Sequence, residues 1–247
     1  MSAGSFRLDI EYDGSGFSGW AKQPGQRTVQ AELEGALETV LGAPIELSVA
    51  GRTDAGVHAW GQVASFSTEV DVPGDLKRRL NGITDGDLAV TAADPVADGF
   101  DARGDATSRS YCYRLLTRRP SSPFERARAL WWPHRIDREG IDACAVALLG
   151  KHDFSAFTPT QTDHVYFERE IHAAVWESQA GDILVFRVTA DAFMRSMVRI
   201  LVGTMLEVAS SRRTVESFTR LLAGAPRPEA GETAPSHGLY LESVSYS

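Results

Sequence analysis

An aspartate in a short polar turn is the residue of this sequence best suited to covalent chemistry. Residues 50–59 read Ala-Gly-Arg-Thr-Asp-Ala-Gly-Val-His-Ala and follow an apolar stretch that is typical of a strand. Arg52 stands two positions before Asp54, and a guanidinium near a carboxylate favours the ionised form. An ionised carboxylate held in a tight turn can act as a nucleophile, so the spacing predicts Asp54 as a catalytic residue. On spacing alone, a purely structural pair of Arg52 and Asp54 is an equally open interpretation.

A second feature is an arginine-rich segment in a chain that is otherwise acidic. The 247 residues carry a formal net charge of −8, whereas residues 100–140 contain nine arginines, no lysine and five acidic residues. Arginine makes two-pronged contacts with phosphates and stacks on bases. The segment therefore suggests a polyanionic partner, although a solvated face with scattered ion pairs would have the same composition.

A glycine motif near the N-terminus resembles a dinucleotide site but lacks its context. Gly14, Gly16 and Gly19 match G-x-G-x-x-G, which in such sites leads directly into a helix. Here a Pro-Gly pair follows at 24–25, and no helix is expected before residue 28. Residues 14–27 are therefore predicted to form a loop, with Phe17 and Trp20 packed or stacking.

Composition argues against metal chemistry and against a membrane span. Cys112 and Cys144 cannot supply a disulfide framework or a zinc site unaided, and Asp54 and His58, four residues apart, have no third ligand at a typical spacing. No apolar run approaches the roughly 18 residues needed to cross a bilayer, and the N-terminus has no signal-peptide core. The sequence predicts a soluble, cytoplasmic protein without metal chemistry.

The elements that must position these residues repeat along the chain. In the first half, alternating and amphipathic patterns predict a β-α-β-β-α-β order, with elements at 6–12, 28–41, 45–49, 62–68, 73–81 and 88–92. The second half shows a similar series, with elements at 111–115, 137–149, 171–175, 183–188, 193–208, 214–222 and 239–246. We therefore predict an α+β protein made of two ferredoxin-like halves, residues 1–99 and 100–247, with a central antiparallel sheet and a cleft between the halves.

Several motifs together resemble the tRNA pseudouridine synthase A family. The most specific is Gly-Arg-Thr-Asp-Ala-Gly-Val-His at 51–58, and the resemblance covers nearly the whole chain. One departure is Ile83-Thr84, where the family usually has Leu-Pro before an acidic residue, which puts a peripheral loop in doubt. The other matching segments are 12–14, 17–20, 27–30, 33–34, 61–63, 100–103, 111–113, 150–154, 197–199 and 238–241.

The resemblance implies a pseudouridine synthase fold and a defined reaction. Uridine would be isomerised to pseudouridine at nucleotides 38, 39 and 40 of the tRNA anticodon stem-loop, by a homodimer that needs no cofactor. Asp54 would be the nucleophile, attacking either the sugar C1′ or the base C6 of a flipped-out uridine. The other residues would bind substrate: Tyr111 against the flipped base, Arg199 paired with Asp54, and Arg52, Arg103, Arg109, Arg114 and Leu239 at the nucleotide or its phosphates.

Two other functions remain as alternatives at this level. A non-catalytic RNA-binding module could share the ferredoxin-like pattern, but neither half clearly shows the aromatic strand motif of RNA-recognition domains. A glycosidase with an aspartate nucleophile would need a paired carboxylate as acid, and no second acid stands near Asp54 in the sequence.

Overall fold

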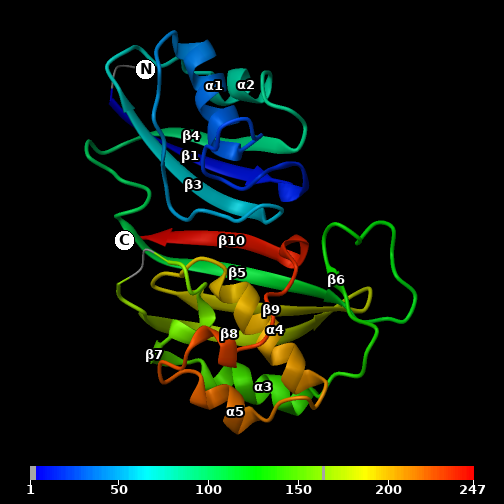
Figure 1. The fold of residues 1–247 in the computed structure, drawn as a ribbon. Coiled ribbons are helices and arrows are strands. Elements are labelled where there is room, and N and C mark those ends of the chain that lie inside the picture. Colours follow the sequence, from blue (N-terminus) through cyan, green and yellow to red (C-terminus); the bar gives the residue numbers. More distant parts are fainter. Residues whose placement is uncertain (1–3, 163–164) are drawn as a thin grey trace. The chain divides into compact units, whose positions relative to one another are not determined.

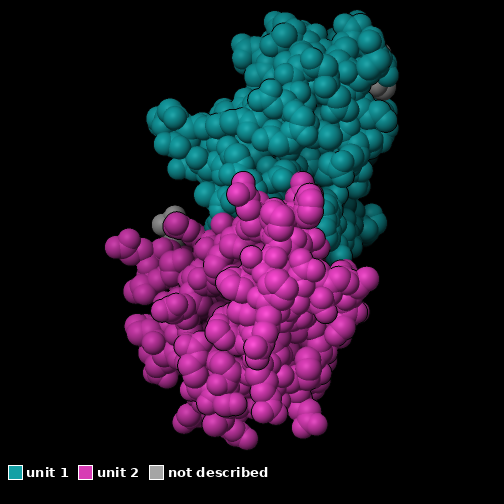
Figure 2. All heavy atoms as spheres, turned by 90° about the vertical axis from the view of Figure 1, so that its right-hand side faces the viewer, with its two compact units in different colours: residues 1–107, 240–247 teal, residues 108–239 magenta. Residues whose placement is uncertain are grey.

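The computed structural model describes residues 4–162 and 165–247, and the chain divides into two compact units (Figure 2). Unit 1 consists of residues 1–107 and 240–247, and unit 2 of residues 108–239. The last strand, which the sequence analysis assigns to the second half, therefore groups with the first. A single division of the sequence into two halves cannot assign a strand at the end of the chain to the unit formed by its beginning.

Unit 1 is built on a small antiparallel sheet. Its strands are β1 (Gly4–Tyr12), β2 (Ser48–Val49), β3 (His58–Thr68) and β4 (Leu88–Val96), arranged in the order β4-β1-β3-β2. The period-two pattern predicted for residues 6–12 is confirmed, because Phe6, Leu8 and Ile10 are buried while the side chains between them are more exposed. β10 (Leu239–Tyr246) runs parallel to β3, with Tyr240 opposite His58.

Two helices lie beside this sheet (Figure 1). They are α1 (Val29–Leu41) and α2 (Leu76–Asn81). The predicted start and stop of the first helix are confirmed: the Thr28 hydroxyl accepts from the Ala31 amide at 3.4 Å, and Gly42 closes the helix in the left-handed conformation. The apolar positions of α1, Val29, Leu33 and Leu37, are fully buried, so this helix covers part of the core.

The strand predicted at 45–49 is shorter in the structure. Only Ser48 and Val49 pair with β3, while the Leu47 amide donates to the Glu34 carboxylate of α1 at 2.9 Å. An amide already bound to a helix side chain cannot donate to a neighbouring strand. Glu34 is itself buried and ion-paired with Lys22, so this polar contact is satisfied on both sides.

Unit 2 contains a second antiparallel set of strands. β5 (Ala106–Leu116), β9 (Ile183–Ala190), β8 (Glu168–Gln179) and β7 (Gly150–Asp153) follow in that order. The elements predicted at 171–175 and 183–188 pair antiparallel as β8 and β9, and the turn between them contains Gly181 and Asp182, both with positive φ. β7 and the two-residue β6 (Leu130–Trp131), which pairs parallel with the end of β5, were not predicted because they are too short to show an alternation.

Three helices complete unit 2: α3 (Arg138–Ala147), α4 (Met197–Ala209) and α5 (Val215–Arg220). They pack on one another, and α3 also packs on β8. The helix predicted at 193–208 begins only at Met197, because Ser196 adopts a left-handed conformation (φ 57°) that interrupts any helix passing through it. Single-turn 3₁₀ helices lie at Gly14–Gly16, Ser155–Phe157, Arg227–Glu229 and Ser236–Gly238.

The α+β class and the predominance of antiparallel strands agree with the sequence analysis. Among the described residues, no helix is long and apolar enough to cross a membrane.

Candidate active site

Asp54 lies in the turn that connects β2 to β3 in unit 1. The Val57 amide donates to the Asp54 carbonyl at 3.1 Å, and Gly56 has a φ of 76°, so the backbone reverses directly after the aspartate. Asp54 is half-buried, Thr53 before it is buried, and Arg52 is exposed. The turn therefore holds the half-buried Asp54 directly after the buried Thr53 and before the exposed Ala55.

A buried polar network fixes the turn from the inside. The Tyr12 hydroxyl and the Thr53 hydroxyl are 2.8 Å apart, and the Gln62 amide donates to the Gly51 carbonyl at 2.7 Å and to the Tyr12 oxygen at 3.3 Å. Burial raises the pKa of Tyr12 to about 12, so its hydroxyl keeps its proton at neutral pH. Both ends of the turn before Asp54 are thus tied to β1 and β3.

The glycine-rich loop at 14–27 holds the turn from the other side. The Trp20 amide donates to the Thr53 carbonyl at 3.0 Å, and the Gly56 amide donates to the Phe17 carbonyl at 3.2 Å. Phe17 and Trp20 are buried, which agrees with the prediction that they are packed or stacking. Glycine at position 14 lets the loop backbone approach the turn closely, because a Cβ there would lie 2.0 Å from the Val57 carbonyl oxygen.

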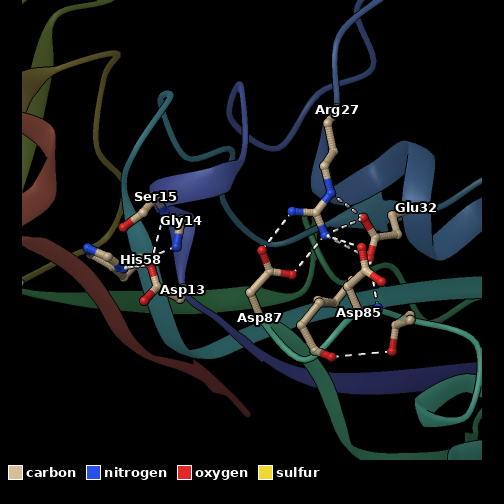
Figure 3. A network of polar contacts seen from close by, with 10 residues as sticks. Asp13, Gly14, Ser15, Arg27, Glu32, His58, Asp85 and Asp87 are labelled. Atoms are coloured by element: carbon tan, nitrogen blue, oxygen red, sulfur yellow. Dashed lines mark hydrogen bonds and ion pairs between the residues drawn. The ribbon is translucent and has the colours of Figure 1, made fainter. Parts of the chain in front are cut away.

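Ion pairs hold this loop at its far end (Figure 3). Arg27 contacts Asp87 at 2.6 Å, Glu32 at 2.9 Å and Asp85 at 3.3 Å, and its guanidinium lies 4.1 Å from the centre of the Phe17 ring. The hydrogen bond from Arg27 lowers the pKa of Asp87, so the pair stays charged at neutral pH. A two-pronged guanidinium with three carboxylates around it fixes the loop more firmly than a single exposed pair would.

The near end of the loop is held by His58 of β3 (Figure 3). The Gly14 amide donates to His58 Nδ1 at 3.0 Å, and Asp13 Oδ1 lies 3.2 Å from the same nitrogen while accepting from the Ser15 amide at 3.0 Å. The His58 ring is buried and stacks on Tyr240 of β10. His58 therefore orders the loop and the last strand, and the structure gives it the role of a packing residue.

Replacing Gly19 by alanine is expected to disturb the Asp54 turn specifically. A Cβ there would lie 2.8 Å from the Thr53 carbonyl oxygen and 3.2 Å from the Ala55 amide nitrogen. Gly25→Ala is a matched control, since Gly25 also has a positive φ but has open space around it. Both variants should lose about 1–2 kcal/mol of stability to the positive φ, and Gly19→Ala should lose more because of its contact with the Thr53 carbonyl. Only Gly19→Ala should lower the single-turnover rate, by about tenfold or more; equal rates for the two variants would contradict this role.

The segment at 100–103 places Arg103 at the surface of unit 1. The Arg103 amide donates to the Asp101 carboxylate at 3.0 Å, and the Ala102 amide donates to Ser65 at 2.9 Å. The Ser48 hydroxyl donates to Asp101, and this bond lowers the pKa of that carboxyl. Arg103 is exposed, so the anchored turn presents its guanidinium to solvent.

The remaining predicted residues lie in unit 2. Tyr111 of β5 is 7% exposed and meets Phe193 edge-on at 5.1 Å between ring centres. Arg109, two residues earlier on the same strand, donates to the Asp191 carbonyl at 2.9 Å. Both therefore contact the loop that precedes α4. Leu239, at the start of β10, is buried.

Arg199 lies on α4 and is half-buried. Its Nε donates to the Ala234 carbonyl at 2.8 Å, and the Ala234 amide donates back to the Arg199 carbonyl at 3.1 Å. Glu207, on the same helix as Arg199, contacts Arg213 at 2.8 Å. Arg114 contacts Glu125 at 3.0 Å, which gives it a structural partner within unit 2. The pairing of Arg199 with Asp54 stays a prediction.

Other features of the described residues do not form an alternative site. No group of three or more His, Cys, Asp or Glu side chains comes together there in a way that could hold a metal ion. A cavity of about 510 Å³ in unit 2 contains none of the predicted site residues. It is lined by Thr117, His134, Ile136, Arg138, Ser178, Gln179, Gly181, Asp182, Ile183 and Leu184.

The positioning roles of Tyr12, Gly19, Arg27 and Gln62 were not predicted. All four belong to motifs that carry the family resemblance, and this is the signal that could have pointed to them. Their spacing from Asp54 gives no hint of contact, because the contacts arise only when β1, the loop and β3 come together.

Comparison with known proteins agrees with these motifs. A family profile described as tRNA pseudouridine synthase matches residues 10–103 and 144–247. Proteins named tRNA pseudouridine synthase A are similar over nearly the full length. The protein of Frankia casuarinae is 44% identical to this chain, that of Myxococcus xanthus 41% and that of Bacillus pumilus 39%. Each alignment covers 97% of this chain. The alignments cover 88%, 91% and 98% of the three relatives, in the same order. The chain thus belongs to the tRNA pseudouridine synthase family.

Proposed function

We propose that this protein isomerises uridine to pseudouridine in tRNA, at nucleotides 38, 39 and 40 of the anticodon stem-loop, with Asp54 as the nucleophile. The observation that carries the proposal is the Asp54 turn, whose backbone is held by Tyr12 and Gln62 on one side and by the 14–27 loop on the other. A carboxylate on a pre-organised backbone needs little reorganisation when it attacks. The near full-length similarity to tRNA pseudouridine synthases A supports the reaction and its substrate.

The reaction exchanges one bond of the nucleoside for another. The uridine leaves the base stack, at a cost of a few kcal/mol that is smaller for a base near a loop. Asp54 attacks C1′ of the sugar or C6 of the base, the N1–C1′ bond breaks, and the uracil turns while it stays bound. A C5–C1′ bond then forms and the bond to Asp54 breaks, which restores the carboxylate. C5 loses its proton and N1 gains one, so substrate and product have the same atoms.

The predicted binding residues take roles that suit their surroundings. Tyr111 supports the flipped base through its ring, and its hydroxyl assists removal of the C5 proton. Arg199 pairs with the Asp54 carboxylate and keeps it aimed. Arg52 and Arg103, both exposed, contact phosphates. Arg109 and Leu239 belong to the same binding surface in this proposal.

Incubation of the full chain with unmodified tRNA transcript tests the proposal. Release of tritium from C5-labelled uridine and mapping of pseudouridine along the product should give modification at nucleotides 38–40 and nowhere else. Binding without modification would instead indicate an RNA-binding module, and release of free uracil would indicate a glycosidase.

We also propose that the protein acts in the cytoplasm as a homodimer, with both units ferredoxin-like. The strand order β4-β1-β3-β2 with two helices supports the ferredoxin-like fold of unit 1. Light scattering at micromolar protein should give twice the mass of the 26.9 kDa chain. A monomer mass under these conditions would count against the dimer and leave the catalytic proposal in place.

A further inference from the structure

One segment of unit 2 combines exposed positive charge with exposed aromatic rings. Residues 117–135 connect β5 to the start of α3 and form the long loop around β6 (Figure 1); we name them the basic-aromatic segment. Its only acidic residue is Glu125, in a chain whose formal net charge is −8. Its five arginines, all exposed, are Arg118, Arg119, Arg126, Arg128 and Arg135.

The one acidic side chain of this segment does not offset that charge at the surface. Glu125 is mostly covered and lies 3.0 Å from Arg114 of β5. Arg114 also donates to the Arg128 carbonyl at 3.1 Å. This internal ion pair uses an arginine outside the segment, so the exposed charge of the segment itself is positive.

Two aromatic side chains stand among the arginines. Phe124 is 85% exposed, and Trp131 is 47% exposed. The indole N–H of Trp131 donates to the Arg118 carbonyl at 3.1 Å. Because this donor is already used, a ligand can interact with Trp131 through the face of its ring. Exposed aromatic faces beside guanidinium groups are the arrangement that proteins use to bind single-stranded nucleic acid, by stacking on bases and neutralising phosphates.

The backbone of the segment is held in place without a ligand. The Trp132 amide donates to the Leu116 carbonyl at 2.8 Å, and Leu130 pairs with Leu115 of β5. Within the segment, the amides of Arg128 and Ala129 both donate to the Glu125 carbonyl at 2.9 Å. Because the turn is already ordered, binding through its side chains carries a small entropic cost.

We propose that the basic-aromatic segment is a second tRNA contact, separate from the modified nucleotide. Its arginines bind phosphates, and Phe124 and Trp131 stack on unpaired bases. The proposal rests on tRNA being the substrate, as proposed above. A protein partner is less well matched, since arginine is well suited to phosphate and the net charge of the whole chain is negative.

Matched variants of the full-length chain test the arginines. Arg119→Gln/Arg126→Gln removes two charges from the segment, and Arg212→Gln/Arg220→Gln removes two exposed charges elsewhere in unit 2. The first pair should lower the log–log salt slope of the Kd for unmodified tRNA by about 1.4–1.8, since each phosphate contact contributes about 0.7–0.9. The second pair should leave the slope unchanged.

A second pair of variants tests the stacking. Phe124→Ser should weaken tRNA binding about fivefold or more, whereas Val146→Ser, which alters an exposed apolar residue of α3, should not. The single-turnover rate at saturating protein should stay within twofold of the unaltered chain for all four variants, because none of these residues belongs to the proposed catalytic set.

The outcomes separate this proposal from the one on which it rests. Equal Kd values and salt slopes for the segment variants and their controls would overturn the second contact, while pseudouridine formation by the unaltered chain would still stand. A halved mass in light scattering with unchanged tRNA affinity would show that the segment joins two copies of this chain, which also overturns it. Failure of the unaltered chain to modify tRNA would instead refute the proposed function.

Discussion

Asp54→Asn is expected to abolish pseudouridine formation while tRNA affinity stays within a few-fold of the unaltered chain. The amide is nearly isosteric with the carboxylate, so the hydrogen bonds that the backbone and the Tyr12, Thr53 and Gln62 side chains make in the turn should persist. An amide is not a competent nucleophile, so the rate should fall by about 10³-fold or more. Tritium release and filter binding on the same preparation measure the two effects separately.

Asp98→Asn is the matched control for this variant. Asp98 is exposed in the same unit and belongs to no contact described for the Asp54 turn, so its replacement should alter neither rate nor affinity. Turnover by purified Asp54→Asn above the background of a protein-free reaction would remove Asp54 from the nucleophile's role. A large loss of affinity together with rate would instead indicate that the carboxylate supports binding.

Arg199→Met should reduce activity by about 10²-fold or more, with a smaller effect on stability. If the guanidinium holds the Asp54 carboxylate in line for attack, its loss leaves the nucleophile without a fixed position, and this lowers the rate. The hydrogen bond from Arg199 to the Ala234 carbonyl is also lost, which accounts for about 1–2 kcal/mol of unfolding free energy. Arg199→Lys should restore part of the rate, because a single ammonium reproduces the charge but not the two-pronged contact.

Arg213→Met is the matched control for Arg199→Met, because it removes an arginine whose contacts are structural. Arg213 contacts Glu207 at 2.8 Å and donates to the Glu229 carbonyl at 2.8 Å, so like Arg199 it joins the α4 region to the segment that follows α5. This variant should lower the melting temperature and leave kcat within a few-fold. If Arg199→Met behaves in the same way, with stability lost and kcat retained, Arg199 is a structural residue and does not act on Asp54.

The parts of the fold that could be predicted are those specified by neighbouring residues. Helix α1 has its start signal at Thr28 and its stop signal at Gly42, and the hairpin of β8 and β9 has Gly181 in its turn. Local patterns gave wrong predictions where a single backbone conformation or a tertiary contact determines the structure. Residues 193–196 continue the apolar pattern of α4 but are not helical, because Ser196 is left-handed. Leu47 lies in an apolar run, yet its amide is bound to Glu34.

The same distinction applies to the candidate site. Asp54 could be predicted because its turn is continuous in sequence and rich in residues that suit chemistry. The groups that hold the turn could not be found from spacing, because Tyr12 is 41 residues from its partner Thr53 and Arg27 is 60 residues from Asp87. Only the fold, which brings the 14–27 loop beside the Asp54 turn and beside the residues that precede β4, places them within hydrogen-bond distance. Family motifs marked these residues without giving the reason for their presence.

The placement of the C-terminal strand has a consequence for how the protein is made on the ribosome. Tyr240 stacks on His58 and on Trp60, and β10 pairs with β3 directly after the Asp54 turn. While residues 240–247 are still inside the exit tunnel, the nascent chain holds almost all of unit 1 but lacks the strand that completes it. The region that carries the aspartate therefore becomes complete only after β10 has left the tunnel. A chain released early by a premature stop codon would retain the whole catalytic motif in sequence and still lack the stack that orders His58.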